Sequence, residues 1–213
     1  MRRAALAVSL VLLAVPAAQA MPVRGPVVAA PLTASPIAWR ESQALGRPYA
    51  GRLVGGVRLP AAGRDFWTYD WGLRTSPNRP WRRWGTDGLV RTVLHVLAEH
   101  RAAHPGAPRV GIADLSRPHG GAFGAEFGGL GHVSHQNGRD VDVLYPRRDG
   151  AERHPGSPRL VDEALAQDLV YRFVRAGASR VYTGLSLDLR GPRRIVQPLA
   201  HHDDHLHVRL GSG

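Results

Sequence analysis

The segment GGLGHVSHQNGRDVDVLY, residues 128–145, holds two histidines, two aspartates and a Gln-Asn-Gly step. Its Asn-Gly pair is a strong turn signal, so the chain can double back at that point. The residues after the turn alternate as in a strand, which places Asp140 and Asp142 on one face and the valines on the other. We therefore expect the turn to bring His135 close to Asp142.

A second histidine group lies in HHDDHLHVRL, residues 201–210. If this segment is a strand, His205 and His207 share one face and Leu206 takes the core face. Two histidines and one aspartate that leave a fourth position to water form the donor set of a catalytic zinc site. The two segments together predict a zinc site on a sheet.

Each of these signals has a structural alternative when it is taken alone. An H-x-H pair can be a surface feature, His132 and Ser134 can simply decorate a loop, and Asp203 and Asp204 can be solvated charges. Asp140 can orient a ligand histidine or stand as a strand-edge carboxylate. The presence of both segments in one chain, each with a turn or strand that aims its side chains, favours the metal site.

The composition is that of a globular protein of 213 residues with 43% hydrophobic residues, for which one domain is expected. The chain has no cysteine, which excludes disulfides, thiolate ligands and a cysteine nucleophile. Its net charge is +11, carried mostly by scattered arginines. Because the basic residues are not interleaved with aromatic ones, nucleic acid is not the expected partner. For a protein outside the membrane the available polyanions are cell-wall polymers and anionic lipid headgroups, and the charge gives modest support to attraction by the wall.

The first residues have the pattern of a secretory signal peptide. Arg2 and Arg3 precede an apolar run that is too short to span a bilayer comfortably, and an A-x-A cleavage site follows. We expect export, with no stable membrane insertion after cleavage. The predicted organisation is a signal peptide over 1–20, a poorly ordered lead-in over 21–45 and a zinc-binding domain over 46–213.

Hydrophobic periodicity predicts more strands than helices and therefore an α+β fold. We expect a small central antiparallel sheet that carries the zinc site and is flanked by two or more helices. The expected strands are 66–71, 109–116, 140–145, 179–184 and 204–210, and the expected helices run from Thr86 or Asp87 to about His100 and over 161–176.

The two segments also resemble a known family. HVSHQNGRDVD (132–142), followed by HDDHLHVRL (202–210), is similar to the motifs of the penicillin-insensitive murein endopeptidases, which belong to the lysostaphin-type, D-Ala-D-Ala-type and hedgehog-type zinc folds. GIADLSRPHGG (111–121) resembles the segment that precedes the first motif. The stretch between the two motifs looks shorter than in better-known members.

The resemblance implies roles for individual residues. It implies that zinc is bound by His135, Asp142 and His207, and that His205 is the catalytic histidine. His132 and His202 line the site, either near the metal or in contact with the substrate. The other candidates for substrate binding or for support of the ligands are Ser134, Gln136, Asp140 and Arg209.

The resemblance further implies a zinc-dependent endopeptidase of the periplasm or cell wall that cleaves D-alanyl–meso-diaminopimelyl crosslinks in peptidoglycan. The chain has no S-x-x-K motif, so an acylable serine is not expected. A D,D-carboxypeptidase, an L,D-type endopeptidase and a non-catalytic, zinc-bearing wall-binding module remain as alternatives. A nucleic-acid binder is contradicted by the signal peptide.

Overall fold

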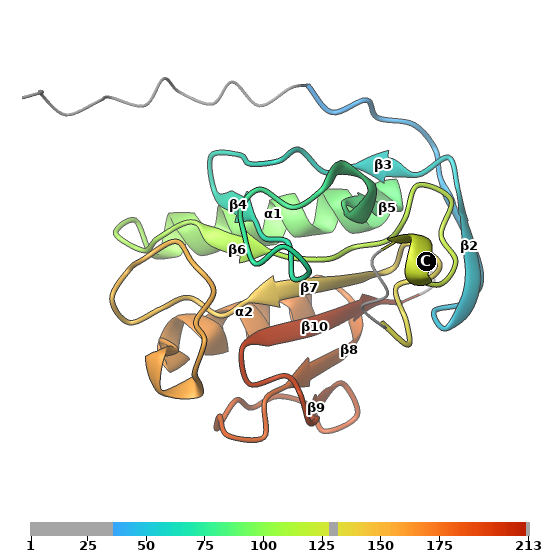
Figure 1. Cartoon of the computed structure of the whole chain (residues 1–213). Coiled ribbons are helices and arrows are strands. Elements are labelled where there is room, and N and C mark those ends of the chain that lie inside the picture. Colours follow the sequence, from blue (N-terminus) through green and yellow to red (C-terminus); the bar gives the residue numbers. More distant parts are fainter. Residues whose placement is uncertain (1–35, 128–131, 212–213) are drawn as a thin grey trace, which may run out of the picture. The chain divides into compact units, whose positions relative to one another are not determined.

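The computed structural model describes residues 36–127 and 132–211, which form an α+β fold around a six-stranded sheet (Figure 1). The central strands pair antiparallel, as expected, and one parallel pair closes each edge of the sheet. The α+β class and the central sheet are therefore confirmed. The strand order is β4 (Phe66–Thr68), β6 (Val110–Ile112), β7 (Asp140–Leu144), β10 (His205–Leu210), β8 (Ala178–Thr183) and β9 (Val196–Pro198).

Helices α1 (Asp87–Ala103) and α2 (Glu163–Arg175) lie behind the sheet in Figure 1. Thr86 begins α1, because its hydroxyl accepts a hydrogen bond of 3.1 Å from the Leu89 N–H, and Asp162 caps α2 in the same way. The sequence-based helix start at Thr86 is confirmed. Three short 3-10 helices complete the helical elements of the described chain: η1 (Pro80–Arg82), η2 (Ala125–Phe127) and η3 (Pro158–Leu160).

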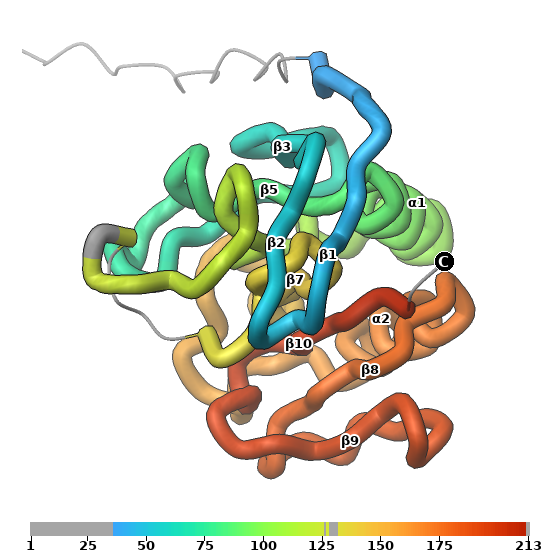
Figure 2. Tube along the Cα trace, turned by 90° about the vertical axis from the view of Figure 1, so that its right-hand side faces the viewer, coloured from blue at the N-terminus to red at the C-terminus, as the bar shows by residue number. Residues whose placement is uncertain are grey.

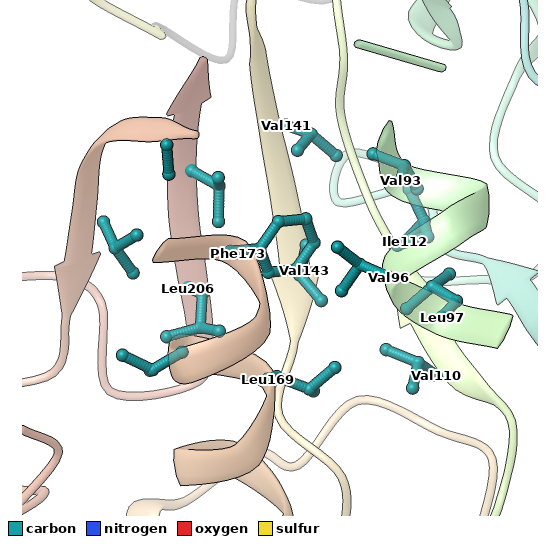
Figure 3. Close-up of a cluster of buried hydrophobic side chains, with 14 of the residues drawn as sticks. Val93, Val96, Leu97, Val110, Ile112, Val141, Val143, Leu169, Phe173 and Leu206 are labelled. Atoms are coloured by element: carbon teal, nitrogen blue, oxygen red, sulfur yellow. The ribbon is translucent and has the colours of Figure 1, made fainter. Parts of the chain in front are cut away.

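The hydrophobic core lies between the sheet and the two helices (Figure 3). Val141 and Val143 of β7 and Leu206 and Val208 of β10 are fully buried there against residues of both helices. Burying an aliphatic side chain of this size stabilises the fold by about 1.5–3 kcal/mol. Because side chains alternate along a strand, the same two strands present their polar residues on the opposite face of the sheet.

A hairpin of β1 (Gln43–Arg47) and β2 (Ala50–Val54) packs against the loops that precede β7 (Figure 2). The Leu53 N–H donates to the His119 carbonyl at 3.0 Å, and the Gln136 N–H donates to the Pro48 carbonyl at 2.9 Å. Gly120 has a φ of +72°, and a Cβ there would lie 2.2 Å from the Gln136 oxygen. Glycine at this position therefore allows the loop to approach the backbone of Gln136 and Leu53 closely. The short strands β3 (Val57–Arg58) and β5 (Trp84–Gly85) pair beside it.

Two predicted strands are shorter than expected. The strand predicted over 66–71 ends at Thr68, because the Asp70 carboxylate turns the chain by accepting hydrogen bonds from Leu73 and Arg79. The strand predicted over 109–116 ends at Ile112.

The predicted signal peptide lies outside the described residues, as does the lead-in up to residue 35, and residues 43–45 belong to β1. Neither helix of the described chain is long and apolar enough to cross a membrane.

Candidate metal centre and active-site cleft

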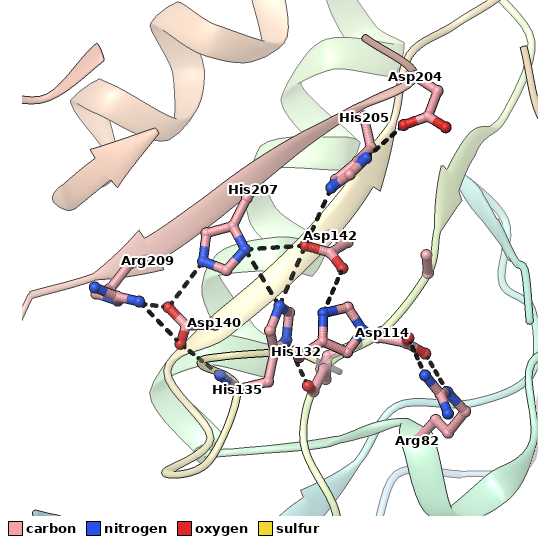
Figure 4. A network of polar contacts seen from close by, with 12 residues as sticks. Arg82, Asp114, His132, His135, Asp140, Asp142, Asp204, His205, His207 and Arg209 are labelled. Atoms are coloured by element: carbon pink, nitrogen blue, oxygen red, sulfur yellow. Dashed lines mark hydrogen bonds and ion pairs between the residues drawn. The ribbon is translucent and has the colours of Figure 1, made fainter. Parts of the chain in front are cut away.

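The polar face of the two central strands supplies the first part of the site. His207 of β10 lies directly opposite Asp142 of β7, and Arg209 lies opposite Asp140. Directly opposed residues of an antiparallel pair project to the same side of the sheet. The H-x-H segment and the D-x-D segment, far apart in sequence, are thus brought face to face (Figure 4).

The turn before β7 adds His135 to this face. Its backbone has a φ of +66°, a left-handed conformation that non-glycine residues adopt rarely, and its N–H donates to an Asp140 oxygen at 2.9 Å. The ring Nδ1–H donates to the Leu115 carbonyl at 2.6 Å. Nε2 consequently points at Asp142, 3.3 Å away. Gly138, with a φ of +76°, completes the turn that the Asn-Gly pair predicts.

Three donor atoms from three residues form a nearly equilateral triangle. His135 Nε2 and His207 Nδ1 are 3.2 Å apart, and they lie 3.3 Å and 3.1 Å from Asp142 Oδ1. Zinc bonds of about 2.0–2.2 Å in a tetrahedron separate the donor atoms by about 3.3–3.6 Å. The sides of the triangle, 3.1–3.3 Å, are thus within about 0.2 Å of the spacing of three tetrahedral zinc ligands.

The Asp142 carboxylate gives a second test of this fit. Its side chain is almost completely buried, yet neither oxygen accepts a hydrogen bond from any described residue. Such a buried charge needs a compensating cation, which the His207 ring at 3.1 Å supplies when it is protonated and which a divalent metal ion would supply in its place. The residues present therefore suit a divalent metal ion.

Two more histidines border the triangle. His132 places Nδ1 3.8 Å from Asp142 Oδ2, while its Nε2 contacts Asp114 at 2.7 Å. His205 places Nε2 3.8 Å from Asp142 Oδ1, while its Nδ1 contacts Asp204 at 2.6 Å. Each histidine thus has one nitrogen bound to an anchoring oxygen and presents the other to the site, the usual arrangement around protein-bound metals.

The ionisation of the cluster follows from burial and these contacts. Burial lowers the pKa of His207, but its contacts with Asp140 and Asp142 outweigh that effect and raise the pKa to about 9. Burial likewise raises the pKa of both carboxyls, but the neighbouring histidines hold them below their usual range. For His135 burial prevails and lowers the pKa. A metal ion must therefore displace the His207 proton, so binding weakens as the pH falls.

The remaining predicted site residues occupy different places. His202 lies beside His205, with ring centroids 4.8 Å apart, and its Nδ1 contacts the Ala200 carbonyl. Arg209 donates to Asp140 at 2.7 Å and so supports the partner of His207. Ser134 lines the cleft described below, whereas Gln136 is not among the residues that line it.

The cleft over the cluster has a volume of about 700 Å³. Its polar part includes Asp142 and four of the site histidines, which are His132, His202, His205 and His207. Its apolar wall comes from Tyr49, Trp71, Val133, Tyr182 and Leu199. A cleft that combines an apolar wall with a few convergent polar groups is the usual form of a binding site.

Sequence reasoning missed the residues that anchor the bordering histidines. Asp114 is fully buried, is paired with Arg82 and holds His132. The sequence allows Asp204 to be a solvated charge, but one of its oxygens binds His205 and the other contacts His154 at 2.9 Å. The one sequence signal for Asp114 was its place in the family-like GIADLSRPHGG segment.

A second group with metal-like spacing joins the two helices. His100 in the last turn of α1 and His104, the residue directly after the helix, lie near Asp168 of α2. Both Asp168 oxygens, however, accept hydrogen bonds from Arg172, at 2.6 Å and 3.0 Å, and His100 contacts one of them at 2.6 Å. The carboxylate is thus already compensated by a cation, and the group acts as an ion-pair network between the helices.

The six-stranded sheet carries a histidine–aspartate cluster whose donor atoms suit a divalent metal ion. Residues 44–189 match the family model described as penicillin-insensitive murein endopeptidase, and the chain belongs to this family. The matched residues include His135 and Asp142, whereas the H-x-H pair of β10 follows them. The resemblance stated from the sequence motifs is confirmed.

Individual relatives agree with the family match. Penicillin-insensitive murein endopeptidases of Salmonella heidelberg, Salmonella paratyphi B and Salmonella newport are each 26% identical to this chain over 195 residues. The alignments cover 79% of this chain and 66% of each relative. The chain therefore spans just under two thirds of the length of these relatives.

Proposed function

We propose that this protein is an exported, zinc-dependent endopeptidase that hydrolyses D-alanyl–meso-diaminopimelyl crosslinks in peptidoglycan. One observation carries the proposal: the buried Asp142 carboxylate has no hydrogen-bond donor and forms a triangle of zinc-ligand dimensions with His135 and His207. Family membership directs the choice of substrate toward murein.

In this proposal His135, Asp142 and His207 hold the ion, with His132 beside them. The bound ion would supply Lewis acidity for the scissile carbonyl and a lowered pKa for a water molecule. His205 presents Nε2 to the same point, so it takes the proton of the attacking water and delivers it to the leaving amine. His202, next to His205, gives its Nδ1–H to the Ala200 carbonyl, so it would donate to the developing oxyanion from Nε2 only when its ring is doubly protonated.

The surroundings suit a wall peptide and an exported enzyme. The cleft is large enough for a branched peptide, and its apolar wall can cover alanyl and diaminopimelyl methylene groups. The net charge of +11 attracts the protein to anionic wall polymers. The amino-terminal pattern favours export to the periplasm or cell wall.

Digestion of defined crosslinks tests the proposal. The mature chain from Met21, loaded with zinc, is incubated with purified diaminopimelate-type muropeptide dimers, and the products are followed by mass spectrometry. Chelator-treated protein and His205→Ala are the matched controls. We expect conversion of dimers to monomers by the zinc-loaded wild type alone.

Other outcomes would replace the proposal. Release of a single terminal alanine would indicate a carboxypeptidase, and cleavage beside an L-residue would indicate an L,D-type endopeptidase. One zinc ion per chain without any cleavage would indicate a wall-binding module. Equal activity after chelation would refute zinc dependence.

A further inference from the structure

A chain of contacts reaches His205 from outside the metal cluster. Asp204 Oδ1 accepts a hydrogen bond from His205 Nδ1 at 2.6 Å, and its Oδ2 accepts one from His154 Nε2 at 2.9 Å. His154 belongs to the loop between β7 and α2, fifty positions before Asp204. Both carboxylate oxygens of Asp204 are thus used, one toward the site and one away from it.

Aromatic contacts fix the outer end of this chain. The His154 ring stacks on Tyr69, with centroids 5.3 Å apart and planes 14° apart. Trp71 meets His154 edge-on at 5.0 Å and also meets His205 at 5.3 Å. His154 is therefore held by its ring faces, and its nitrogen is directed at Asp204 by packing.

The backbone fixes Asp204 independently. Its carbonyl accepts a hydrogen bond of 3.2 Å from the Tyr145 N–H at the end of β7. Its side chain is 31% exposed and that of His154 is 22% exposed, so neither lies in bulk solvent, and Asp204 lines the cleft. A carboxylate fixed in this way selects the histidine tautomer with a proton on Nδ1 and leaves the Nε2 lone pair free.

We propose that Asp204 and His154 are positioning residues that hold the His205 ring with Nε2 facing Asp142. The inference rests on the proposed function, because it assigns these residues to the proton transfer by His205. Neither residue faces the metal triangle: the contacts of Asp204 are with His205 and His154. Neither residue would touch the reacting atoms. Both would act by orienting His205, the proposed base, in the way that the third residue of a catalytic triad orients its histidine.

Steady-state kinetics on muropeptide dimers test this role with paired variants. Asp204→Ala removes both hydrogen bonds, whereas Asp204→Asn keeps an oxygen that can accept from His205. His154→Phe keeps the stack on Tyr69 and loses the donor, whereas His154→Gln keeps a donor. Asp203→Asn, a carboxylate change one position away, is the control. Zinc content and melting temperature are measured for each variant.

We expect Asp204→Ala to lower kcat by about 10- to 100-fold, the range found for residues that orient active-site histidines, with KM and zinc content unchanged. His154→Phe lowers kcat in the same direction, while Asp204→Asn and His154→Gln recover part of it. In a His205→Ala background, Asp204→Ala has no further effect, because both changes disable the same proton transfer. A further tenfold loss there, or an unchanged kcat in the single variants, would overturn the inference.

A spectroscopic measurement separates this inference from the proposed function. Nitrogen-15 NMR of the histidine rings in the zinc-loaded full chain reports which nitrogen of His205 carries the proton. We expect the Nδ1–H form in the wild type and its loss in Asp204→Ala. If the wild type cleaves no wall fragment, the proposed function fails and the tautomer still decides the inference. If cleavage occurs but the tautomer is the same in both proteins, the inference fails alone.

Discussion

Breaking the buried ion pair of Arg82 and Asp114 should destabilise the protein strongly. Both side chains are fully buried, and the guanidinium binds the carboxylate through two hydrogen bonds of 2.6 Å and 2.5 Å. Arg82→Met leaves the buried carboxylate with only His132 and Asn78 as partners, and Asp114→Leu leaves a buried guanidinium without its anion. Removing one partner of such a pair costs about 3–5 kcal/mol.

The magnitude can be carried through to a melting temperature. In a domain of this size, 1 kcal/mol corresponds to about 2–4 °C, so each single variant should melt about 6–20 °C below the wild type. The double variant Arg82→Met/Asp114→Leu removes both charges and should recover to within about 2 kcal/mol of the wild type, because apolar replacements of buried pairs are often neutral.

Asp114 has a second function that the double variant does not restore. It contacts His132 at 2.7 Å, so the double variant should regain its stability and still cleave muropeptides slowly. Urea unfolding followed by tryptophan fluorescence, with chelator present throughout, measures the stabilities. Losses below about 1 kcal/mol in both single variants, or a double variant as unstable as the sum of the two, would refute the reasoning.

Three further predictions concern other parts of the molecule. Saturating zinc, at about 1,000 times its Kd, should stabilise the wild type by about 4 kcal/mol, or about 8–16 °C, and Asp142→Asn should abolish this response in a thermal melt. Burial raises the pKa of Asp168, but Arg172 and His100 outweigh it and lower the pKa to about 2. Because the folded-state pKa lies below the ordinary value, this stabilisation is present above about pH 4 and is lost as the pH falls toward 2. Asp168→Asn should therefore cost about 1–3 kcal/mol at pH 7 and much less near pH 2 in urea titrations, and an equal cost at both pH values would contradict this. Gly120→Ala should cost at least about 1–3 kcal/mol in the same assay, since φ is +72° and backbone atoms occupy the Cβ position; a loss of a few tenths would show that the loop relaxes.

The sequence predicts those parts of the site that depend on local geometry. The Asn-Gly turn and the alternation of β7 are sufficient to bring His135 to Asp142, seven positions on, and the alternation of β10 aligns His205 with His207. The relative position of each pair is determined by the conformation of the few residues between its members. They could therefore be derived before any tertiary contact was known.

The anchors of the bordering histidines could not be derived in this way. Arg82 reaches Asp114 across 32 positions, and His154 reaches Asp204 across 50 positions. In sequence, Asp204 is one of two adjacent acids, and no local rule distinguishes the one that turns inward. The strand predicted over 66–71 failed for a similar reason, because its end depends on how the Asp70 carboxylate is used.

The place of β10 in the sheet has a consequence for the order of folding. β10 inserts between β7 and β8, and its His207 meets Asp140 across 67 positions of chain. Closing so long a loop lowers the entropy of the chain before the pairing can lower its free energy. We therefore expect the pairing to form late and slowly during folding. A half-folded chain holds His135 and Asp142 without their partner strand. Under the proposed function, activity should therefore appear only at the last folding step, and metal binding followed during refolding would report when that step occurs.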